Sequence, residues 1–264
     1  MKRHIRNLAV VCTLGLFAIV CLAADENREG GERRGGREGR AGRAGRPTSR
    51  PAFLDKEHAP KPGDRSWVRL FNGRDLKGWK PFSEKGPNSW KVEDRILAID
   101  FKEGEHGTNL MSEEKFGDFE IYYEYLVPKG GNSGVFLRGQ YEIQIQADHG
   151  VPSDKPRDWG NGGIYNLKAP SKNVSKPEGE WQSVYATLIG KKINVFLNGE
   201  KIIDNYELPK ATHIYGEAKV KDGDPTGPII LQGDHKPIKF RYVMVKPIKP
   251  KAEEKPAEKP AEKK

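Results

Sequence analysis

The sequence of 264 residues predicts an all-β fold, a β-sandwich of the jelly-roll type formed by a single domain with disordered tails at both ends. Two observations support this prediction. Many short segments alternate apolar and polar residues with a period of two, and Gly, Asn, Asp or Pro separates one segment from the next. By contrast, no segment shows the sustained 3.6-residue periodicity, with capping residues, that an amphipathic helix requires.

The ends of the chain differ in composition from this predicted domain. Residues 1–24 are predicted to be a secretory signal peptide, because three basic residues precede an apolar run that is short for a membrane span. Residues 25–63 are expected to form a disordered Arg/Gly-rich arm and linker, and residues 249–264 a disordered Lys/Pro/Ala/Glu tail, since neither segment has an apolar face to bury. The folded domain is therefore expected over residues 64–248.

The basic charge lies at the ends of the chain, and no nucleic-acid partner is expected, because a protein with a signal peptide is exported and rarely meets nucleic acid. The formal net charge is +9, and the signal peptide, residues 25–46 and the tail together account for +7 of it, so the basic character belongs to the ends.

Both cysteines, Cys12 and Cys21, lie in the signal peptide, which excludes disulfides, cysteine nucleophiles and thiolate metal sites from the rest of the chain. We expect a secreted or periplasmic protein with no transmembrane span after signal removal. Its tails are expected to bind acidic envelope polymers, or to have no role.

The first half of the domain is predicted to supply five strands. Ser66–Phe71 opens it, a loop over residues 72–79 follows, and Trp90–Ile99 contains two short strands about an acidic turn. A short strand at Asn109–Ser112 precedes the longest one, Phe116–Val127. In that strand the alternation predicts two faces, one with Glu120, Tyr122 and Glu124 and the other with Ile121, Tyr123 and Tyr125.

The next segment is predicted to be a β-hairpin whose second strand has two different faces. Gly134–Arg138 and Tyr141–Gln146 alternate as strands, and residues 138–140 form the tight reversal between them. In the second strand Glu142, Gln144 and Gln146 share one face, opposite the apolar residues. This row of a carboxylate and two carboxamides suits a polar ligand such as a sugar, because amides both donate and accept hydrogen bonds. An ordinary solvated sheet face is the alternative.

The remainder of the domain combines one long loop with further strands. Residues 147–180 are rich in Gly, Pro, Asp and Asn and lack periodicity, and a loop of this length inside a compact domain is usually functional or disordered. Residues 181–203 predict three strands, with a tight turn at Asn198-Gly199. The last two strands are expected over Pro228–Gly233 and Lys236–Pro247.

A series of short motifs runs through this predicted domain. They are Leu70-Phe71-Asn72-Gly73, Leu76-x-Gly78-Trp79, Trp90-x-Val92, Phe116-Gly117-Asp118-Phe119, Asn132-Ser133-Gly134-Val135-Phe136-Leu137-Arg138, Tyr141-Glu142-x-Gln144-Ile145, Gly162-Gly163-Ile164-Tyr165, Gly179-Glu180-Trp181, Leu197-Asn198-Gly199, Gly227-Pro228-Ile229-Ile230-Leu231-Gln232 and Phe240-Arg241. In this order and spacing they resemble the 3-keto-disaccharide hydrolase domain family. The resemblance implies a concanavalin A-like, laminin-G-like jelly roll that cleaves glycosides oxidised at C3. One departure is Tyr242, where the family more often has Asn, and we interpret it as a structural change.

The activity that the resemblance implies needs different chemistry from that of a standard retaining glycosidase. A retaining pair of carboxyl groups stands about 5 Å apart, whereas the next carboxylate after Glu142, that of Asp148, is roughly 20 Å away along a regular strand. With a ketone at C3, a base removes the acidic C2 proton, the C1 leaving group departs by elimination, and water then adds. The site therefore needs a general base, a group that polarises the ketone and an acid for the leaving oxygen.

Four residues are the catalytic candidates. Glu142 and Glu124 are expected on polar faces of neighbouring strands, and Arg138 is suited to hold an oxyanion. His235, a residue type that titrates near neutral pH, follows a strand that the resemblance places beside them. Plainer readings are a Glu142–Arg138 ion pair, a solvated Glu124 and a His235 at a surface turn. The candidates for substrate binding are Asn132, Gln144, Gln146, Tyr122, Gln232, and Trp159 and Tyr165, the last two being sugar-stacking platforms or local core.

The sequence requires no cofactor, and a divalent metal such as Ca²⁺ is one option. Asp148, Asp154 and Asp158 in the long loop offer the oxygen ligands that Ca²⁺ takes, although their spacing fits no specific metal motif and they serve equally well as solubilising residues. We favour an exported carbohydrate-active hydrolase or lyase that acts on 3-keto-glycosides, because acid, base and amide side chains gather on one predicted face. The alternatives are a non-catalytic carbohydrate-binding module of the cell envelope and an envelope-associated structural protein.

Overall fold

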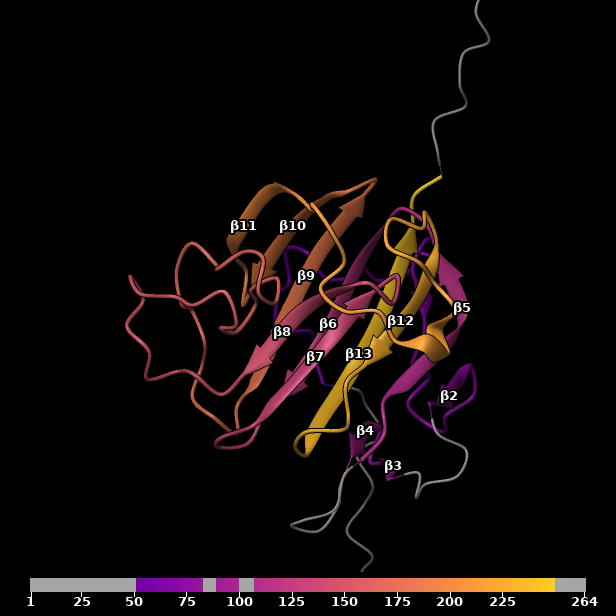
Figure 1. Cartoon of the computed structure of the whole chain (residues 1–264). Coiled ribbons are helices and arrows are strands. Elements are labelled where there is room, and N and C mark those ends of the chain that lie inside the picture. Colours follow the sequence, from indigo (N-terminus) through magenta and orange to yellow (C-terminus); the bar gives the residue numbers. More distant parts are fainter. Residues whose placement is uncertain (1–50, 83–88, 100–106, 250–264) are drawn as a thin grey trace, which may run out of the picture. The chain divides into compact units, whose positions relative to one another are not determined.

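The computed structural model describes residues 51–82, 89–99 and 107–249, which form a sandwich of two antiparallel sheets (Figure 1). The predicted β-sandwich is confirmed, and this part of the chain holds no α-helix, only a short 3-10 turn at Gly216–Ala218. None of its helical residues forms a segment long and apolar enough to cross a membrane. The predicted signal peptide, the Arg/Gly-rich arm up to residue 50 and the tail from residue 250 lie outside the described residues.

The larger sheet has eight strands, seven of them in the order β11-β10-β9-β6-β13-β4-β3, while β1 pairs with β13. Asn198 and Gly199, with φ of 55° and 86°, form the predicted tight turn between β10 and β11, because both residues accept a left-handed backbone. Among the described strands β13, with ten residues, is longer than β6, which was expected to be the longest. The strands are β1 Val68–Arg69, β3 Trp90–Glu93, β4 Ile96–Ile99, β6 Phe119–Leu126, β9 Trp181–Ile189, β10 Lys192–Leu197, β11 Glu200–Glu207 and β13 Ile238–Pro247.

The smaller sheet has five strands in the order β2-β5-β12-β7-β8. Its predicted hairpin, β7 and β8, turns at Arg138 and Gly139, which have φ of 54° and 65°. Strand β2 lies partly in a segment that the sequence predicted to be a loop, because its three residues are too few to show any alternation. The strands are β2 Trp79–Pro81, β5 Leu110–Phe116, β7 Asn132–Leu137, β8 Tyr141–Gln146 and β12 Gly227–Leu231.

The inner faces of the two sheets enclose one main apolar core. Tyr123 on β6 and Ile143 on β8 both belong to it and are completely buried. Successive side chains of a strand point to opposite faces. Glu124, which follows Tyr123, and Glu142, which precedes Ile143, therefore project from the outer faces of two different sheets. Two opposite faces of the sandwich therefore carry a buried carboxylate each, and their surroundings decide which one is available to a ligand.

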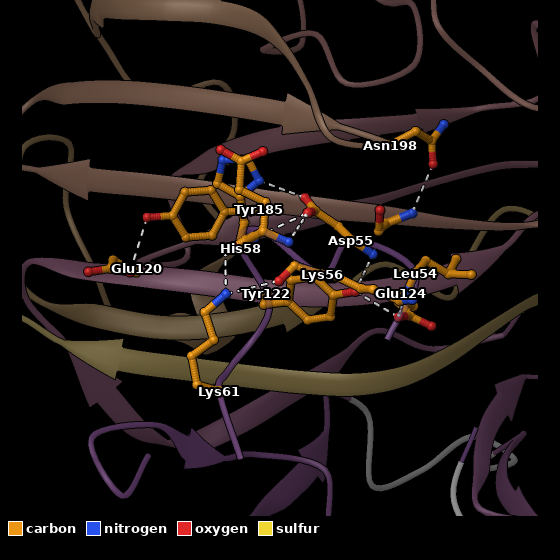
Figure 2. A network of polar contacts seen from close by, with 12 residues as sticks. Leu54, Asp55, Lys56, His58, Lys61, Glu120, Tyr122, Glu124, Tyr185 and Asn198 are labelled. Atoms are coloured by element: carbon orange, nitrogen blue, oxygen red, sulfur yellow. Dashed lines mark hydrogen bonds and ion pairs between the residues drawn. The ribbon is translucent and has the colours of Figure 1, made fainter. Parts of the chain in front are cut away.

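Residues 51–61 pack against the outer face of the larger sheet, and we call them the N-terminal clamp (Figure 2). The Leu54 N–H donates a hydrogen bond to Glu124 Oε1 (2.8 Å). Phe53 meets the Tyr122 ring edge-on at a centroid distance of 5.4 Å, and Ala59 is buried in the same cluster. The prediction of a disordered linker is therefore wrong over residues 51–63, because the local sequence does not reveal that a short segment without periodicity finds an apolar surface elsewhere in the fold.

His58 and Tyr242 hold the two ends of the N-terminal clamp. The His58 ring stacks on Tyr185 at a centroid distance of 4.8 Å, and its Nδ1 lies 2.8 Å from Asp55 Oδ2 (Figure 2). At the other end the Tyr242 hydroxyl donates a hydrogen bond to the Pro51 carbonyl. Tyr242 sits at a bulge of β13 with a left-handed φ of 56°, a conformation that Asn adopts more readily than Tyr. The presence of Tyr there is accounted for by its contact with the clamp.

Candidate functional site

The site is built on the outer face of the β7–β8 hairpin. Glu142 is paired with Phe136 and Gln144 with Gly134, so the acidic and amide side chains of β8 lie beside one aromatic ring and one glycine of β7. A Cβ atom at Gly134 would lie only 2.1 Å from Glu142 Oε1. The absence of a side chain at Gly134 leaves the space that the Glu142 carboxyl group occupies, and any side chain there would displace that group.

A crossover segment, residues 209–226, lies against the same hairpin and brings aromatic and ionisable side chains over it. The Thr212 hydroxyl donates to the Gln140 carbonyl (3.0 Å) and accepts from the Glu142 N–H (2.9 Å). The Gln140 side chain, itself completely buried, donates to the Asp224 carbonyl (2.9 Å) and accepts from the Gly223 N–H (2.8 Å). These four hydrogen bonds fix the segment at both of its ends.

The long loop closes the other side, because part of it pairs with the outer edge of β8. Gln144 N–H donates to the Gly163 carbonyl (2.9 Å), Gly162 N–H donates to the Gln144 carbonyl (2.8 Å), and Tyr165 N–H donates to the Glu142 carbonyl (3.2 Å). The loop thus extends the sheet as a short additional edge, beside β8 in Figure 1. Tyr165 reaches the site as a consequence of this pairing.

These three elements and the end of β12 enclose a cavity of about 330 Å³. A second cavity of the same volume, near β3 and β4, is lined by aliphatic, lysine and proline side chains and by Glu93, and offers no histidine or amide. The first cavity differs because carboxylates, imidazoles, amides and aromatic rings all line it, a mixture typical of sites that bind and transform polar ligands. Its lining residues are Asn132, Phe136, Glu142, Gln144, Tyr165, Thr212, His213, Tyr215, Gln232, Asp234 and His235.

Glu142 has the most unusual electrostatic environment in this cavity. The residue is only 4% exposed, and burial raises the pKa of its carboxyl group to about 8, with a smaller contribution from the charge of Asp234. No hydrogen bond from another described residue stabilises the charged form. At neutral pH the group is therefore mostly protonated and is able to donate a proton to a ligand in the cavity.

Two imidazoles and a phenol face the same space. His235 Nδ1 lies 2.6 Å from Asp234 Oδ1, an arrangement that orients the ring and leaves Nε2 available. The His213 ring meets Tyr215 edge-on at a centroid distance of 4.3 Å. Burial raises the pKa of the Tyr215 hydroxyl to about 12, so this hydroxyl stays protonated as a hydrogen-bond donor.

Amide side chains complete the lining. Gln144 Nε2 donates to Asn132 Oδ1 (3.0 Å), which joins the two strands of the hairpin across Gly134. Gln232 is 6% exposed, and its Oε1 has no hydrogen-bond partner among the described residues. The structure thus brings together five sequence-predicted site residues, namely Glu142, His235, Asn132, Gln144 and Gln232, with Tyr165 as a sixth.

The expectation that Glu124 and Glu142 lie on neighbouring strands is wrong. Strand β6 pairs with β9 and β13, whereas β8 belongs to the other sheet. Glu124 is fully buried beneath the N-terminal clamp, where it accepts a hydrogen bond from Tyr122 Oη at 2.7 Å (Figure 2). It also accepts one from Arg241 Nε at 2.5 Å. Glu124 and Tyr122 are therefore structural residues, and both are removed from the candidate site.

Arg138 also lies away from the cavity. Its guanidinium donates to the carbonyls of Gly117 and Gly190, both at 2.7 Å, and pairs with Asp118 Oδ1 at 2.6 Å. With 3% exposure and every nitrogen engaged, it forms neither the oxyanion contact nor the ion pair with Glu142 that the sequence suggested. A residue at a hairpin turn is free to point along the sheet edge, and sequence spacing does not determine that direction.

The remaining predicted residues lie outside the cavity lining. Gln146 is paired with Asn132 at the far end of the hairpin. Asp148 uses both carboxylate oxygens within the loop, accepting from Asn161 N–H (2.9 Å) and Ser175 Oγ (2.8 Å). Among the described residues no group of three or more His, Cys, Asp or Glu side chains is arranged to hold a metal ion, so Asp148, Asp154 and Asp158 form no such cluster.

Sequence reasoning missed five lining residues, Thr212, His213, Tyr215, Asp234 and Phe136. The first three lie in a segment without strand periodicity, which gave no reason to place it over the hairpin. The sequence His213-Ile214-Tyr215 offers a usable signal, because ionisable and aromatic residues close together in a loop are common in binding sites. Asp234 immediately precedes His235, and that adjacency indicates a carboxylate that orients an imidazole.

Comparison with known proteins places these residues in a family context. Residues 66–246 match the model of the 3-keto-alpha-glucoside-1,2-lyase-like domain, and every lining residue of the cavity falls within that range. A relative from Bacteroides thetaiotaomicron, named 3-keto-disaccharide hydrolase, is 30% identical over 95 residues. That match covers 34% of this chain and 32% of the relative, so it spans about a third of the length of that protein.

Solved structures show the same sandwich. A crystal structure from Parabacteroides distasonis, provisionally named a glycosyl hydrolase, is 27% identical with a TM-score of 0.56, and the match covers 70% of this chain and 84% of that one. A second structure from the same organism, with the same provisional name, is 22% identical with a TM-score of 0.55 and covers 69% and 94%. At that lower identity the likeness supports the fold alone.

Proposed function

Because the chain belongs to the family of 3-keto-alpha-glucoside-1,2-lyase-like domains, we propose that its cavity cleaves 3-keto-glycosides by proton abstraction at C2, elimination at C1 and addition of water. The family and its named relatives are carbohydrate-active, and the cavity on the β7–β8 hairpin is the site to which we assign the reaction. The N-terminal sequence favours export, and we propose that the protein acts in the periplasm or outside the cell.

One observation carries this proposal. The Glu142 carboxyl group is almost completely buried, has no hydrogen bond from another described residue, and faces a cavity that also holds two imidazoles. A buried carboxyl group without a partner is costly in a purely structural role, because its ionised form is not compensated. Glu124 on the other sheet shows the contrast, since its carboxylate is saturated by Leu54, Tyr122 and Arg241.

The base that the reaction needs is assigned to His235. Asp234 accepts a hydrogen bond from Nδ1, and this orientation leaves the lone pair of Nε2 free to take the C2 proton of the substrate. The ketone acidifies that proton, and the electron pair moves onto the C3 oxygen. Tyr215, whose hydroxyl remains protonated, is the candidate donor to this oxygen, with His213 beside it as a second donor.

The acid is assigned to Glu142. When the C1–O bond breaks, the leaving oxygen takes the proton of the Glu142 carboxyl group, and a C1–C2 double bond forms in the sugar. Water then adds to C1, giving its proton to the Glu142 carboxylate, while the His235 imidazolium returns a proton to C2. Both residues end in their starting states, so the enzyme turns over with no further reactant than water.

Deuterium exchange at C2 separates these two roles. The unaltered protein is incubated in D₂O with a 3-keto-disaccharide, and NMR follows both exchange at C2 and release of the free sugar. His235→Ala is expected to lower exchange and release together by about a hundredfold or more. Glu142→Gln is expected to lower release by a similar factor while exchange continues, because the base remains in place.

The matched control is Glu114→Gln, the same substitution at an exposed position on β5. Normal release in both His235→Ala and Glu142→Gln would contradict the assignment of this cavity as the active site. If the unaltered protein binds a glycan saturably and releases no sugar from any 3-keto-glycoside, the non-catalytic binding module is the correct function.

A further inference from the structure

We propose that Trp159 and Arg157 form a stacking platform for the second ring of the substrate, the sugar that leaves when the C1–O bond breaks. This inference rests on the proposed function and names the residues that bind the leaving sugar, so that a disaccharide is bound better than a glycoside with a small leaving group. Trp159 is 38% exposed and is the single aromatic side chain in the exposed class among the described residues. An exposed indole offers an apolar ring face on which a sugar ring can stack.

Trp159 is not one of the residues that line the cavity, but the backbone of the long loop brings it close to Tyr165, which is. The Asn166 N–H donates to the Asp158 carbonyl (3.2 Å), and the neighbouring residue Tyr165 lines the cavity and is bonded to Glu142. Trp159 follows Asp158 and Tyr165 precedes Asn166, so the two residues flank the hydrogen-bonded pair Asp158–Asn166 on the same side. With about 3.8 Å between consecutive Cα atoms, the two Cα atoms lie within roughly 13 Å of each other.

The platform is held rigid before a ligand arrives. The Gly160 N–H donates to the Arg157 carbonyl (2.9 Å), and Gly163 N–H donates to the Gly160 carbonyl (3.0 Å). A Cβ atom at Gly160 would lie 3.0 Å from the Arg157 carbonyl oxygen and 3.1 Å from Asp148 Oδ2, so the turn is tightly packed. A rigid turn adds little ordering cost when a ligand binds.

The chemistry of the pair suits a sugar ring. The Arg157 guanidinium carbon lies 4.5 Å from the centroid of the Trp159 ring and covers one face of the indole. The uncovered part of the ring system is available to the C–H face of a pyranose, and the guanidinium offers donors to its hydroxyl groups. Stacking of this kind accepts different sugars, because it reads a ring face and few individual hydroxyls.

A second pair of the same type provides a matched control. The Arg241 guanidinium lies 4.2 Å from the Trp181 ring centroid, but this pair belongs to the larger sheet, and Arg241 is engaged by the buried Glu124. None of these three residues lines the cavity. Removing the Trp181 indole therefore tests what the loss of an arginine-stacked tryptophan does at a position remote from the substrate.

The test uses the full chain and two substrates, a 3-keto-disaccharide and a methyl 3-keto-glucoside, whose leaving group lacks a ring. The measured quantity is the KM for the disaccharide divided by the KM for the methyl glycoside. Trp159→Ala is expected to raise this ratio about three- to tenfold, the loss that a single stacking contact accounts for. Trp159→Phe restores most of the lost discrimination, Arg157→Ala gives a smaller rise, and Trp181→Ala leaves the ratio unchanged. An unchanged ratio in Trp159→Ala would overturn the platform.

A binding measurement makes the result independent of turnover. In the Glu142→Gln background, calorimetry gives the Kd of the intact 3-keto-disaccharide with and without Trp159→Ala. A three- to tenfold weaker Kd supports the platform, and an equal Kd overturns it. If the unaltered protein cleaves neither substrate, the proposed reaction fails, while the calorimetric comparison still decides whether Trp159 binds the second ring.

Discussion

At the scale of single residues, the structure contains two buried glutamates whose surroundings give them opposite characters. Glu124 is saturated by three donors under the N-terminal clamp, and one of those donors is a guanidinium. Glu142 has no such partner among the described residues and faces a cavity. The same residue type is thus held by an ion pair on one sheet and is available for proton transfer on the other, since the neighbours decide which charge state is stable.

The raised pKa of Glu142 predicts the pH dependence of turnover. An acid must be protonated to act, so kcat with a 3-keto-disaccharide is expected to fall about tenfold per pH unit above the Glu142 pKa of about 8. Measurement of kcat between pH 6 and 10 checks this expectation, and Glu114→Gln should keep the same profile. A kcat that rises through pH 8 would show that the carboxylate form is the active one.

Much of the site at this scale could be predicted from the sequence, and the failures have physical causes. Glu142 and Gln144 follow from a strict period of two, which fixes the face of a strand wherever the opposite face is apolar. The position of Glu124 could not be predicted in the same way. The alternation shows which face of its strand a residue is on, but it does not show to which of the two sheets the strand belongs. The direction of the Arg138 side chain depended on acceptors at Gly117 and Gly190, which are distant in sequence.

At the scale of elements, one hydroxyl connects the crossover segment to the hairpin that carries the acid. Thr212 Oγ1 joins the Gln140 carbonyl to the Glu142 N–H, and the next residues of the segment, His213 and Tyr215, line the cavity. The segment and the hairpin therefore keep a fixed separation. This element was missed from the sequence because non-periodic segments are positioned by such long-range contacts and not by local propensity.

Thr212→Val removes this connection while preserving the shape of the side chain. We expect kcat/KM for a 3-keto-disaccharide to fall about tenfold or more, because small displacements of positioned groups are costly, and the free energy of unfolding to fall by about 1–3 kcal/mol, because the Glu142 N–H loses its acceptor. Steady-state kinetics and urea denaturation measure the two effects. Thr212→Ser keeps the hydroxyl and should retain most of both quantities; equal losses in Ser and Val variants would contradict the role of the hydroxyl.

At the scale of the whole molecule, the N-terminal clamp extends the folded unit beyond the residues that the family model matches. The match begins at residue 66, whereas Phe53, Asp55 and Ala59 already contact the larger sheet. The fold class and most strands were predictable because periodicity and turn residues are local signals. The start of the folded unit was not, because it depends on the aromatic surface offered by Tyr122 and Tyr242 from two other strands.

Deletion of residues 51–63 from the otherwise complete chain measures the contribution of the clamp. The deletion uncovers the buried Glu124 and the aromatic rings beneath Phe53, so we expect a loss of about 2–4 kcal/mol and a fall in Tm of roughly 5–15 °C. Calorimetry provides the measurement. Removal of residues 25–46, which lie outside the described part of the chain, is the control and is expected to leave Tm nearly unchanged. A deletion of residues 51–63 without effect on Tm would show that the clamp contacts add nothing.

Strand β8 contributes alternate residues to the core and to the cavity. The strand register that completes the core is therefore the same register that assembles the cavity. A chain paired one residue out of register would turn Glu142 and Gln144 into the apolar interior and Ile143 toward solvent, and such a chain would not complete its core. Misregistered molecules are thus expected to be much less stable than the native fold. Every molecule that folds should therefore also carry an assembled cavity, so the folded fraction and the fraction with an intact cavity are expected to be equal.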